Sequence, residues 1–278
     1  MNAKGYWPNP KSWHGLSPDQ KDWSRKVEQL AGLYCDPVIL TSPADPFVYQ
    51  NGSGFLFKPG DRTFLVTNAH VLIDGYEKIK AKSGAAEFRF GERTFEPKIV
   101  AINADDDIDL AIIDVDGMEF AEREPGYWGS NVGSLNTFAP SSWPAARPDH
   151  GDKIVSVGWP AKFRAHEEDG VEFAAFPFLG HAVDFVASGW FSVPFDRTEW
   201  TTANFEPDNP ALLETAFGGM SGAPVFSLHR GGVAPLQLIG VVRTYGAGLD
   251  VLYCTRADIL NADGTITIRA EEHPARQV

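Results

Sequence analysis

The hydrophobic pattern of the chain changes near residue 35. Before that point, Ser17-Pro18-Asp19 has the composition of a helix start: an N-cap serine, a proline at the first position and an acid in the first turn. Trp23, Val27 and Leu30 then recur on one helical face. We predict a helix from Ser17 to about Leu30 that packs on the rest of the protein. A helix that binds a partner is the alternative.

From Cys35 onward, apolar residues come in short runs typical of β-strands, separated by turns such as Lys58-Pro59-Gly60-Asp61. The spacing favours a small antiparallel barrel in each half of the chain. The first set of runs is 38–40, 54–57, 63–67, 87–90, 99–102 and 110–115. The second set is 153–157, 170–176, 181–185, 189–195, 224–227, 236–242 and 251–254, with a short helix expected before residue 260.

The pattern therefore predicts an all-β fold with two six-stranded antiparallel β-barrels and an added N-terminal arm and helix. The expected segments are the arm and helix (1–34), the first barrel (35–120), a turn-rich crossover (121–150), the second barrel (151–262) and a charged tail (263–278).

The net charge of the chain excludes some classes of binding partner. The net charge is −13, whereas a protein that binds phosphates needs a basic face, so we exclude nucleic acid and anionic membrane surfaces as partners. The two cysteines could form one bridge at most, which favours a reducing compartment. The first thirteen residues lack the apolar stretch of a signal peptide, and no apolar run is long enough to span a bilayer. We expect a cytoplasmic protein.

One serine lies among small residues, in Gly218-Gly219-Met220-Ser221-Gly222-Ala223-Pro224. Glycines on both sides would let the N–H groups of Gly219 and Ser221 point at one spot beside the hydroxyl, as in an oxyanion hole. The alternative is a plain tight turn before a strand.

A base and an acid for this serine lie upstream. His70 follows the apolar run 64–66 within Thr67-Asn68-Ala69-His70-Val71, and the acidic turn 105–109 enters the run 110–115. A nucleophilic serine needs such partners, and their order along the chain is His, Asp, Ser.

Five segments in this order resemble the trypsin-like serine peptidases, in particular the bacterial HtrA/Deg type: 52–55, 67–71, 109–112, 151–160 and 219–224. They span about residues 50 to 260. The resemblance implies a chymotrypsin-like double barrel and a serine endopeptidase that cuts protein or peptide bonds. No PDZ-like segment follows the catalytic region, so we carry over no oligomeric or peptide-sensing behaviour.

The resemblance also assigns the roles. Ser221 attacks the scissile carbonyl, His70 transfers the proton, Asp109 orients His70, and the N–H groups of Gly219 and Ser221 hold the oxyanion. Asp109 directly precedes Leu110-Ala111-Ile112 as in the family pattern. Its neighbours at positions 105–107 are competitors, whose alternative is a solvated acidic turn.

Met220 departs from extracellular trypsins, which have aspartate before the nucleophile and pair it with a newly cut N-terminus. Methionine cannot form that ion pair, so we do not expect activation by N-terminal cleavage. If the enzyme is held latent, we expect a partner or the substrate to order the loop.

The substrate pocket is placed by resemblance around Thr215 and Ala216 on one side and Arg243, Thr244, Tyr245 and Gly246 on the other. Thr244 could also support the aspartate of the triad. A cationic Arg243 in the pocket would favour acidic substrate side chains. The preferred interpretation is that Arg243 faces solvent or an internal carboxylate and that the pocket takes a small or medium apolar side chain.

The other histidines show no metal-ligand spacing, so we expect no metal and no cofactor. The sequence predicts a regulated intracellular serine endopeptidase that acts on proteins or peptides, with a regulatory protein partner as a further expectation. The alternative is a protease fold that is latent or inactive and acts as a binding or regulatory module.

Overall fold

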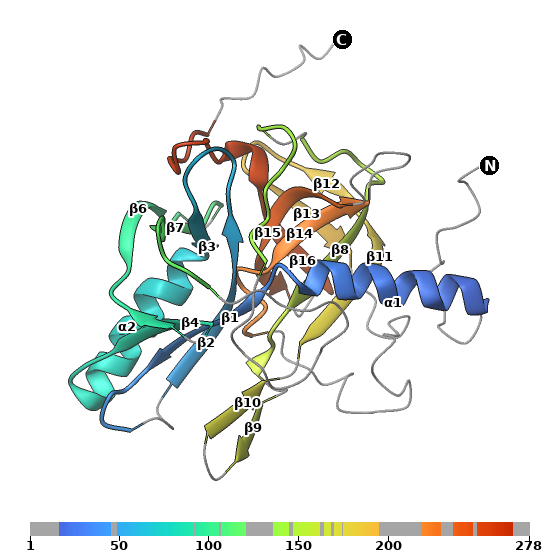
Figure 1. The fold of residues 1–278 in the computed structure, drawn as a ribbon. Helices are drawn as coiled ribbons and strands as arrows, with labels where there is room; N and C mark the ends of the chain where they lie inside the picture. Colours follow the sequence, from blue (N-terminus) through green and yellow to red (C-terminus); the bar gives the residue numbers. More distant parts are fainter. Residues whose placement is uncertain are drawn as a thin grey trace.

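The computed structural model describes residues 17–45, 49–91, 93–105, 107–120, 136–144, 147–161, 164–167, 170–173, 175–194, 218–228, 236–246 and 249–268 of the chain. In these residues the strands form two seven-stranded antiparallel sheets and a two-stranded ribbon, and two α-helices lie beside them (Figure 1). The predicted all-β fold class is confirmed, with seven strands in each sheet where six were expected.

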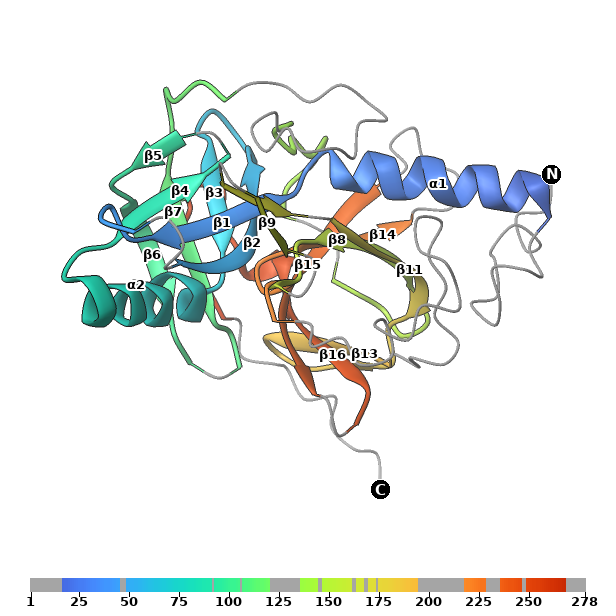
Figure 2. The same cartoon turned by 90° about the horizontal axis from the view of Figure 1, so that it is seen from below.

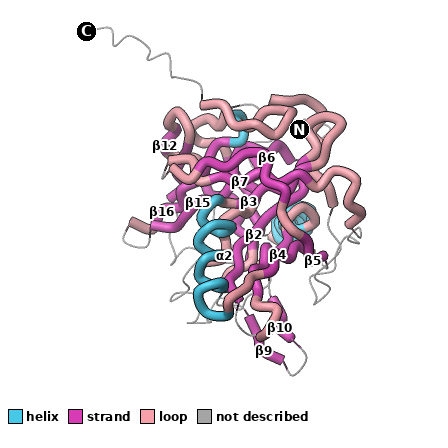
Figure 3. Tube along the Cα trace, turned by 90° about the vertical axis from the view of Figure 1, so that its left-hand side faces the viewer, coloured by secondary structure: helices cyan, strands magenta, loops and turns pink. Residues whose placement is uncertain are grey.

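The first sheet has the order β5-β4-β1-β2-β3-β7-β6. Its strands are β1 (Asp36–Thr41), β2 (Tyr49–Phe57), β3 (Phe64–Thr67), β4 (Glu87–Phe90), β5 (Arg93–Phe95), β6 (Lys98–Asn103) and β7 (Leu110–Asp114). Helix α2 (Ala69–Ser83) packs against β1, β2 and β7 (Figure 3). It ends where Gly84 takes a left-handed conformation with φ 80°. The sequence predicted no helix here.

The second sheet has the order β11-β8-β14-β15-β16-β13-β12. Its strands are β8 (Lys153–Gly158), β11 (Phe176–Ala182), β12 (Phe185–Val186), β13 (Trp190–Pro194), β14 (Pro224–Leu228), β15 (Leu236–Gly246) and β16 (Val251–Arg256). The ribbon pairs β9 (Arg164–Glu167) with β10 (Gly170–Phe173), and a 3-10 turn (Ala257–Ile259) follows β16.

A shared hydrophobic core joins the two sheets. It contains Phe55 and Phe57 from β2, Val155 from β8 and Phe226 from β14, all of them almost fully buried. A smaller cluster lies under α2 on the other side of the first sheet. Because the larger cluster draws on both sheets, burial of its apolar surface holds the two halves together.

The N-terminal helix α1 (Pro18–Gly32) packs against β8 and β11 of the second sheet (Figure 2). Ser17 and Gln20 form a capping box, in which each side chain accepts a hydrogen bond from the backbone N–H of the other. Val27 and Ala31 are buried, which confirms the predicted helix that packs on the body. The predicted arm before residue 17, most of the crossover and the end of the tail lie outside the described residues.

Both cysteines of the chain, Cys35 and Cys254, are buried, and neither forms a disulfide. The bridge that the composition allowed is therefore absent from the structure. Burial raises the pKa of the Cys254 thiol well above its usual range. No helix within the described ranges is both long and apolar enough to cross a membrane.

Candidate active site

His70 and Asp109 meet because their strands are neighbours. His70 lies in the first turn of α2, directly after β3, and Asp109 precedes β7, which pairs with β3 through Thr67 and Ala111. The Nδ1 atom of His70 lies 2.5 Å from Oδ2 of Asp109, and the backbone N–H of His70 donates to Oδ1 at 2.9 Å. Both oxygens of one carboxylate therefore hold the imidazole and its backbone.

Asp109 is itself fixed from the other side. The side-chain amide of Asn68 donates to the backbone oxygen of Asp109 at 2.7 Å and to Oδ2 at 3.1 Å. Asp109 is 9% exposed and has φ 47°, a left-handed conformation that aspartate tolerates better than most residues. Of the competing acids, Asp105 and Asp107 are exposed and Asp106 lies outside the described residues.

The loop that carries Asp109 also receives a hydrogen bond from the second sheet. The hydroxyl of Thr255 on β16 donates to the backbone oxygen of Ile108. Thr244, which the sequence analysis considered for this supporting role, is exposed. No sequence pattern pointed to Thr255, since the carbonyl that its hydroxyl reaches depends on how the two sheets are docked.

Ser221 and His70 line the same small cavity. The cavity has a volume of about 220 Å³ and is lined by residues that include His70, Ser221, Gly219 and Ala161. The hydroxyl of Ser221 donates to the backbone oxygen of Arg243 at 3.0 Å. In this arrangement the hydroxyl proton is directed at a carbonyl group of β15 and not at the imidazole.

The peptide groups around Ser221 have defined orientations. The backbone oxygen of Gly218 accepts from the N–H of Ala161 at 2.7 Å, and that of Met220 accepts from the N–H of Ala223 at 3.0 Å. In a trans peptide the N–H points opposite to the C=O. The N–H groups of Gly219 and Ser221, which share these two peptides, are thus turned away from the atoms that hold the carbonyls.

Glycine is required at two positions of this loop. Gly219 has φ 99°, and a Cβ there would lie 2.5 Å from the backbone oxygen of Trp159. Gly222 has φ 94°, and a Cβ there would lie 1.9 Å from the backbone oxygen of Ser53. Both positions combine a left-handed backbone with close contact to another strand, so any side chain would force the loop to move.

The four described residues of the predicted substrate pocket lie in β15 and do not line the cavity beside Ser221. Arg243 is 9% exposed, and its guanidinium lies 5.8 Å from the ring centre of Trp190 and 5.7 Å from that of Tyr253. One of its nitrogens is 3.9 Å from a carboxylate oxygen of Asp107.

The remaining residues of the predicted substrate pocket are Thr244, Tyr245, Gly246, Thr215 and Ala216. Thr244 is exposed, the hydroxyl of Tyr245 donates to Asp250, and Gly246 pairs with Val251. Thr215 and Ala216 lie outside the described residues.

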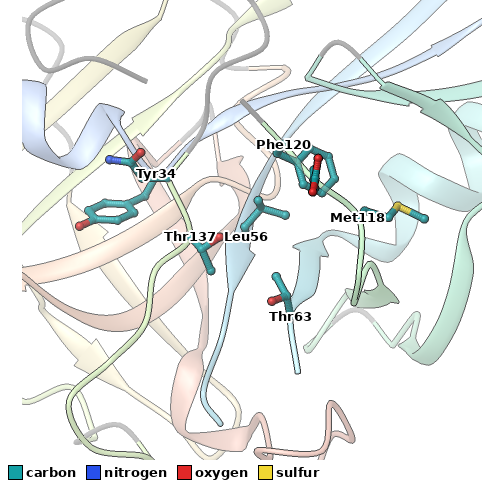
Figure 4. Close-up of a pocket in the computed structure, with 8 residues that line it drawn as sticks. Tyr34, Leu56, Thr63, Met118, Phe120 and Thr137 are labelled. Atoms are coloured by element: carbon teal, nitrogen blue, oxygen red, sulfur yellow. The ribbon is translucent and has the colours of Figure 1, made fainter. Parts of the chain in front are cut away.

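A second, larger cavity of about 630 Å³ lies at the end of α1 (Figure 4). Its lining includes Tyr34, Leu56, Thr63, Met118, Phe120 and Thr137. None of the predicted catalytic residues lines it. Burial raises the pKa of the Tyr34 hydroxyl. Over the described ranges, no group of three or more histidine, cysteine or acidic side chains is placed to hold a metal ion.

Two proteases are among the proteins of known structure to which the chain is similar. The Rv3671c protease from M. tuberculosis, in its active form, is 17% identical with a TM-score of 0.44, over 82% of this chain and 79% of that chain. Tobacco etch virus protease complexed with product is 13% identical with a TM-score of 0.39, over 81% of this chain and 75% of that chain. No curated protein matches the sequence.

The sequence profile of the trypsin-like peptidase domain matches residues 52–234. This match covers more than half of the chain and includes the positions of His70, Asp109 and Ser221. The two antiparallel sheets agree with the double barrel of such peptidases. The chain belongs to the trypsin-like peptidase family.

Proposed function

We propose that the protein is a serine endopeptidase in which His70, Asp109 and Ser221 form the catalytic triad. The observation that carries the proposal is the pairing of His70 with Asp109 at 2.5 Å, together with the cavity that both His70 and Ser221 line. A serine hydroxyl becomes a nucleophile when an oriented base can take its proton, and Asp109 supplies that orientation through Nδ1.

The reaction proceeds in two steps. The hydroxyl of Ser221 turns from the Arg243 carbonyl to Nε2 of His70 and attacks the carbonyl carbon of the substrate, and its proton passes to His70. The tetrahedral intermediate collapses, the amine leaves with that proton, and an acyl-enzyme remains on Ser221. Water then attacks the ester, His70 takes a proton from the water, and the same proton returns to Ser221 as the acid product leaves.

The negative oxygen of the intermediate would be held by the N–H groups of Gly219 and Ser221. The carbonyls that share these peptides bond to Ala161 and Ala223, which supports N–H groups turned towards the substrate. Neither N–H donates to another protein atom in the described part of the chain. Two donors without a partner beside a nucleophile are suited to a charge that appears only during the reaction.

One observation favours the second candidate, a latent or inactive protease fold that acts as a binding or regulatory module. The Ser221 hydroxyl donates to the Arg243 carbonyl. It therefore does not donate to His70, and the hydrogen-bonded chain of the proposed triad is incomplete. A regulatory partner, or the substrate itself, would then have to turn Ser221 towards His70. The two candidates differ in whether the purified protein reacts by itself.

The deciding experiment is labelling with a fluorophosphonate probe, read by intact mass. We expect the wild type to gain one probe mass on Ser221, and we expect Ser221→Ala and heat-unfolded wild type to gain none. A folded wild type that stays unlabelled would exclude the constitutively active enzyme and leave the latent module. Profiling with a peptide library then measures the cleavage preference, for which we propose small or medium apolar residues before the scissile bond.

We also propose the HtrA/Deg type as the branch of the family. The motifs Gly52-Ser53-Gly54 and Thr67-Asn68-Ala69-His70-Val71 support it. The first motif lies in β2 beside the Ser221 loop, and the second ends β3 and begins α2.

A further inference from the structure

The loop that carries Ser221 needs hydrogen bonds from other segments to fix its backbone conformation. Three of its five residues from 218 to 222 are glycines, and glycine has the widest range of backbone conformations. Met220 is 2% exposed and packs at the end of β8, where a Cβ on Gly158 would lie 2.7 Å from its sulfur. This apolar contact fills space but fixes no peptide orientation.

Ser53, in the middle of β2, makes four hydrogen bonds around this loop. Its backbone N–H donates to the oxygen of Ser221 at 2.7 Å, and its hydroxyl donates to the oxygen of Gly219 at 2.7 Å. The same hydroxyl accepts from the N–H of Trp159 at 3.0 Å, and the Ser53 carbonyl accepts from the hydroxyl of Thr67 at 2.8 Å. Ser53 is 0% exposed, so water cannot replace any of these bonds.

Trp159, the partner of that hydroxyl, is held at three points by the first sheet. Its N–H bonds to Ser53, its carbonyl accepts from the side chain of Asn51 at 2.9 Å, and its indole N–H donates to the oxygen of Cys35 at 3.2 Å. The segment after β8 is thus fixed on β2 and on the residue that precedes β1. Because the Ser53 hydroxyl bonds to both Trp159 and Gly219, it couples the position of Gly219 to that of this segment.

We propose that Ser53 is a positioning residue: its hydroxyl holds the peptide between Gly219 and Met220, which joins the two peptides whose N–H groups are the proposed oxyanion donors, and so keeps both donors in orientation. It touches no substrate and acts only through Gly219. The proposal rests on the proposed function, because it concerns the same two N–H donors. It goes further in naming what keeps a glycine-rich loop in its reactive conformation without an ion pair at position 220.

Removal of the Ser53 hydroxyl should disturb the Ser221 loop because this one group has two buried hydrogen-bond partners. In Ser53→Ala, the carbonyl of Gly219 and the N–H of Trp159 both lose a buried hydrogen bond, while the backbone bond to Ser221 remains. The peptide between Gly219 and Met220 can then rotate more easily, since Gly219 has no side chain to restrict it, and this rotation would carry the neighbouring donor peptides with it. Small displacements of catalytic groups cost up to about 100-fold in rate.

The test compares Ser53→Ala with Ser156→Ala. Ser156 is also fully buried, on β8, but its hydroxyl has no hydrogen-bond partner in the described residues. For each variant, the rate constant of fluorophosphonate labelling and the final labelled fraction are measured well below the unfolding temperature, and kcat and KM on the best library peptide follow. Amide hydrogen exchange over residues 218–226 provides a readout that needs no activity.

We expect Ser53→Ala to label and turn over about 10- to 100-fold more slowly at full labelled fraction. KM should stay within about twofold. Ser156→Ala should behave as wild type. A merely structural role would lower the melting temperature or the labelled fraction and leave the rate constant of the folded enzyme unchanged, and that result would overturn the proposal.

Two further outcomes, an unlabelled wild type and an unfolded Ser53→Ala, would also test the proposal. If the wild type does not label, the proposed function fails; faster exchange over 218–226 in Ser53→Ala alone would then support the positioning role of Ser53, and unchanged exchange would refute it. If Ser53→Ala does not fold, Ser53→Cys takes its place, because a thiol is a weaker donor. We expect an intermediate rate from it, and a wild-type rate would count against the proposal.

Discussion

The two halves of the candidate site are built in different ways. His70, Asp109 and Asn68 all lie beside the ends of β3 and β7 in the first sheet, and His70 and Asp109 are 39 positions apart in the sequence. Ser221 lies in the loop before β14 of the second sheet, and the hydroxyl that bonds to the carbonyl of Gly219 in this loop comes from Ser53, 166 positions earlier. The acid–base half is a local construction, whereas the nucleophile half depends on the docking of two sheets.

This difference indicates where the site is vulnerable. The His70–Asp109 pair is complete without the second sheet, apart from the support that Thr255 gives to the Asp109 loop. The Ser221 loop is bonded through Ser53 to β2 and to the segment after β8, so we expect it to lose its orientation when these contacts are disturbed. Substitutions in the first half should therefore change chemistry at nearly constant stability, and those in the second half should change both.

The largest effect is expected from Asp109→Asn. An amide cannot accept the Nδ1–H of His70 as the carboxylate does, so the imidazole takes the wrong tautomer and turnover should fall by about 10⁴. Asparagine tolerates the left-handed backbone of position 109, so the melting temperature should change little. The exposed Asp105→Asn serves as control and should keep wild-type kcat. Similar losses in both variants would show that the local charge matters and not the pair.

The next largest effect is expected in the loop that carries Ser221. A methyl group at Gly219 would lie 2.5 Å from the Trp159 oxygen on a backbone with φ 99°, so Gly219→Ala should displace an oxyanion donor. We expect a loss of about 10²–10³ in kcat together with a lower melting temperature. At Gly218, a Cβ would have open space, so Gly218→Ala should stay within a few-fold of wild type. Equal behaviour of the two variants would refute the steric argument.

A smaller effect, on stability alone, is expected from Glu28 in α1. Glu28 is 3% exposed, and burial raises its pKa from 4.5 to about 8, while Arg25 acts in the opposite direction. The folded protein therefore keeps a proton that the unfolded chain releases above about pH 4.5. Stability should fall by about 1.4 kcal/mol per pH unit up to about pH 8 and then level off.

Replacement of Glu28 by glutamine removes this titration. Thermal unfolding of Glu28→Gln should show little gain over wild type at pH 5 and a clear gain at pH 8. Glu77→Gln, at an exposed position of α2, should show the same small difference at both values. A gain of equal size at pH 5 and pH 8 would mean that Glu28 is not neutral in the folded protein.

The smallest effect has the opposite pH dependence and belongs to the first sheet. A hydrogen bond from Lys98 at 2.8 Å, with further bonds from Asp116 N–H and Arg62, lowers the pKa of Asp114. Its contribution is present at neutral pH and is lost as the pH falls through the folded pKa. Asp114→Asn should cost about 1 kcal/mol at pH 7 and less in acid, measured by urea unfolding. Exposed Asp61→Asn should cost nothing at either pH.

Much of the architecture follows from the sequence, because it depends on short-range patterns. The capping box at Ser17 and the alternating runs of both sheets are local signals, and the structure has α1 and most of the predicted strands. Helix α2 was missed, since Val71, Leu72 and Ile79 are too sparse to indicate a helix of fifteen residues. The short strands β5 and β9 also lacked a clear pattern.

The candidate site was predictable for the same reason, and only in part. His70 and Asp109 stand beside apolar runs, and the order of the motifs, through its resemblance to the trypsin-like peptidases, placed them in one site. Ser53 and Thr255 could not be recognised as supporting residues, because each acts on a backbone carbonyl of the opposite half. Which carbonyl a hydroxyl reaches is decided by the docking of the sheets, and no local pattern of residues encodes that.

The two buried thiols have a practical consequence for chemical labelling. Cys35 and Cys254 are the only cysteines of the chain, and both are enclosed by protein, with the pKa of Cys254 raised so that little reactive thiolate forms. A cysteine introduced on the exposed face of α2, for example Lys80→Cys, would be the one thiol open to maleimide reagents in the folded protein. A fluorophore could then be attached to the helix that carries His70, in its last turn, without removal of either native cysteine.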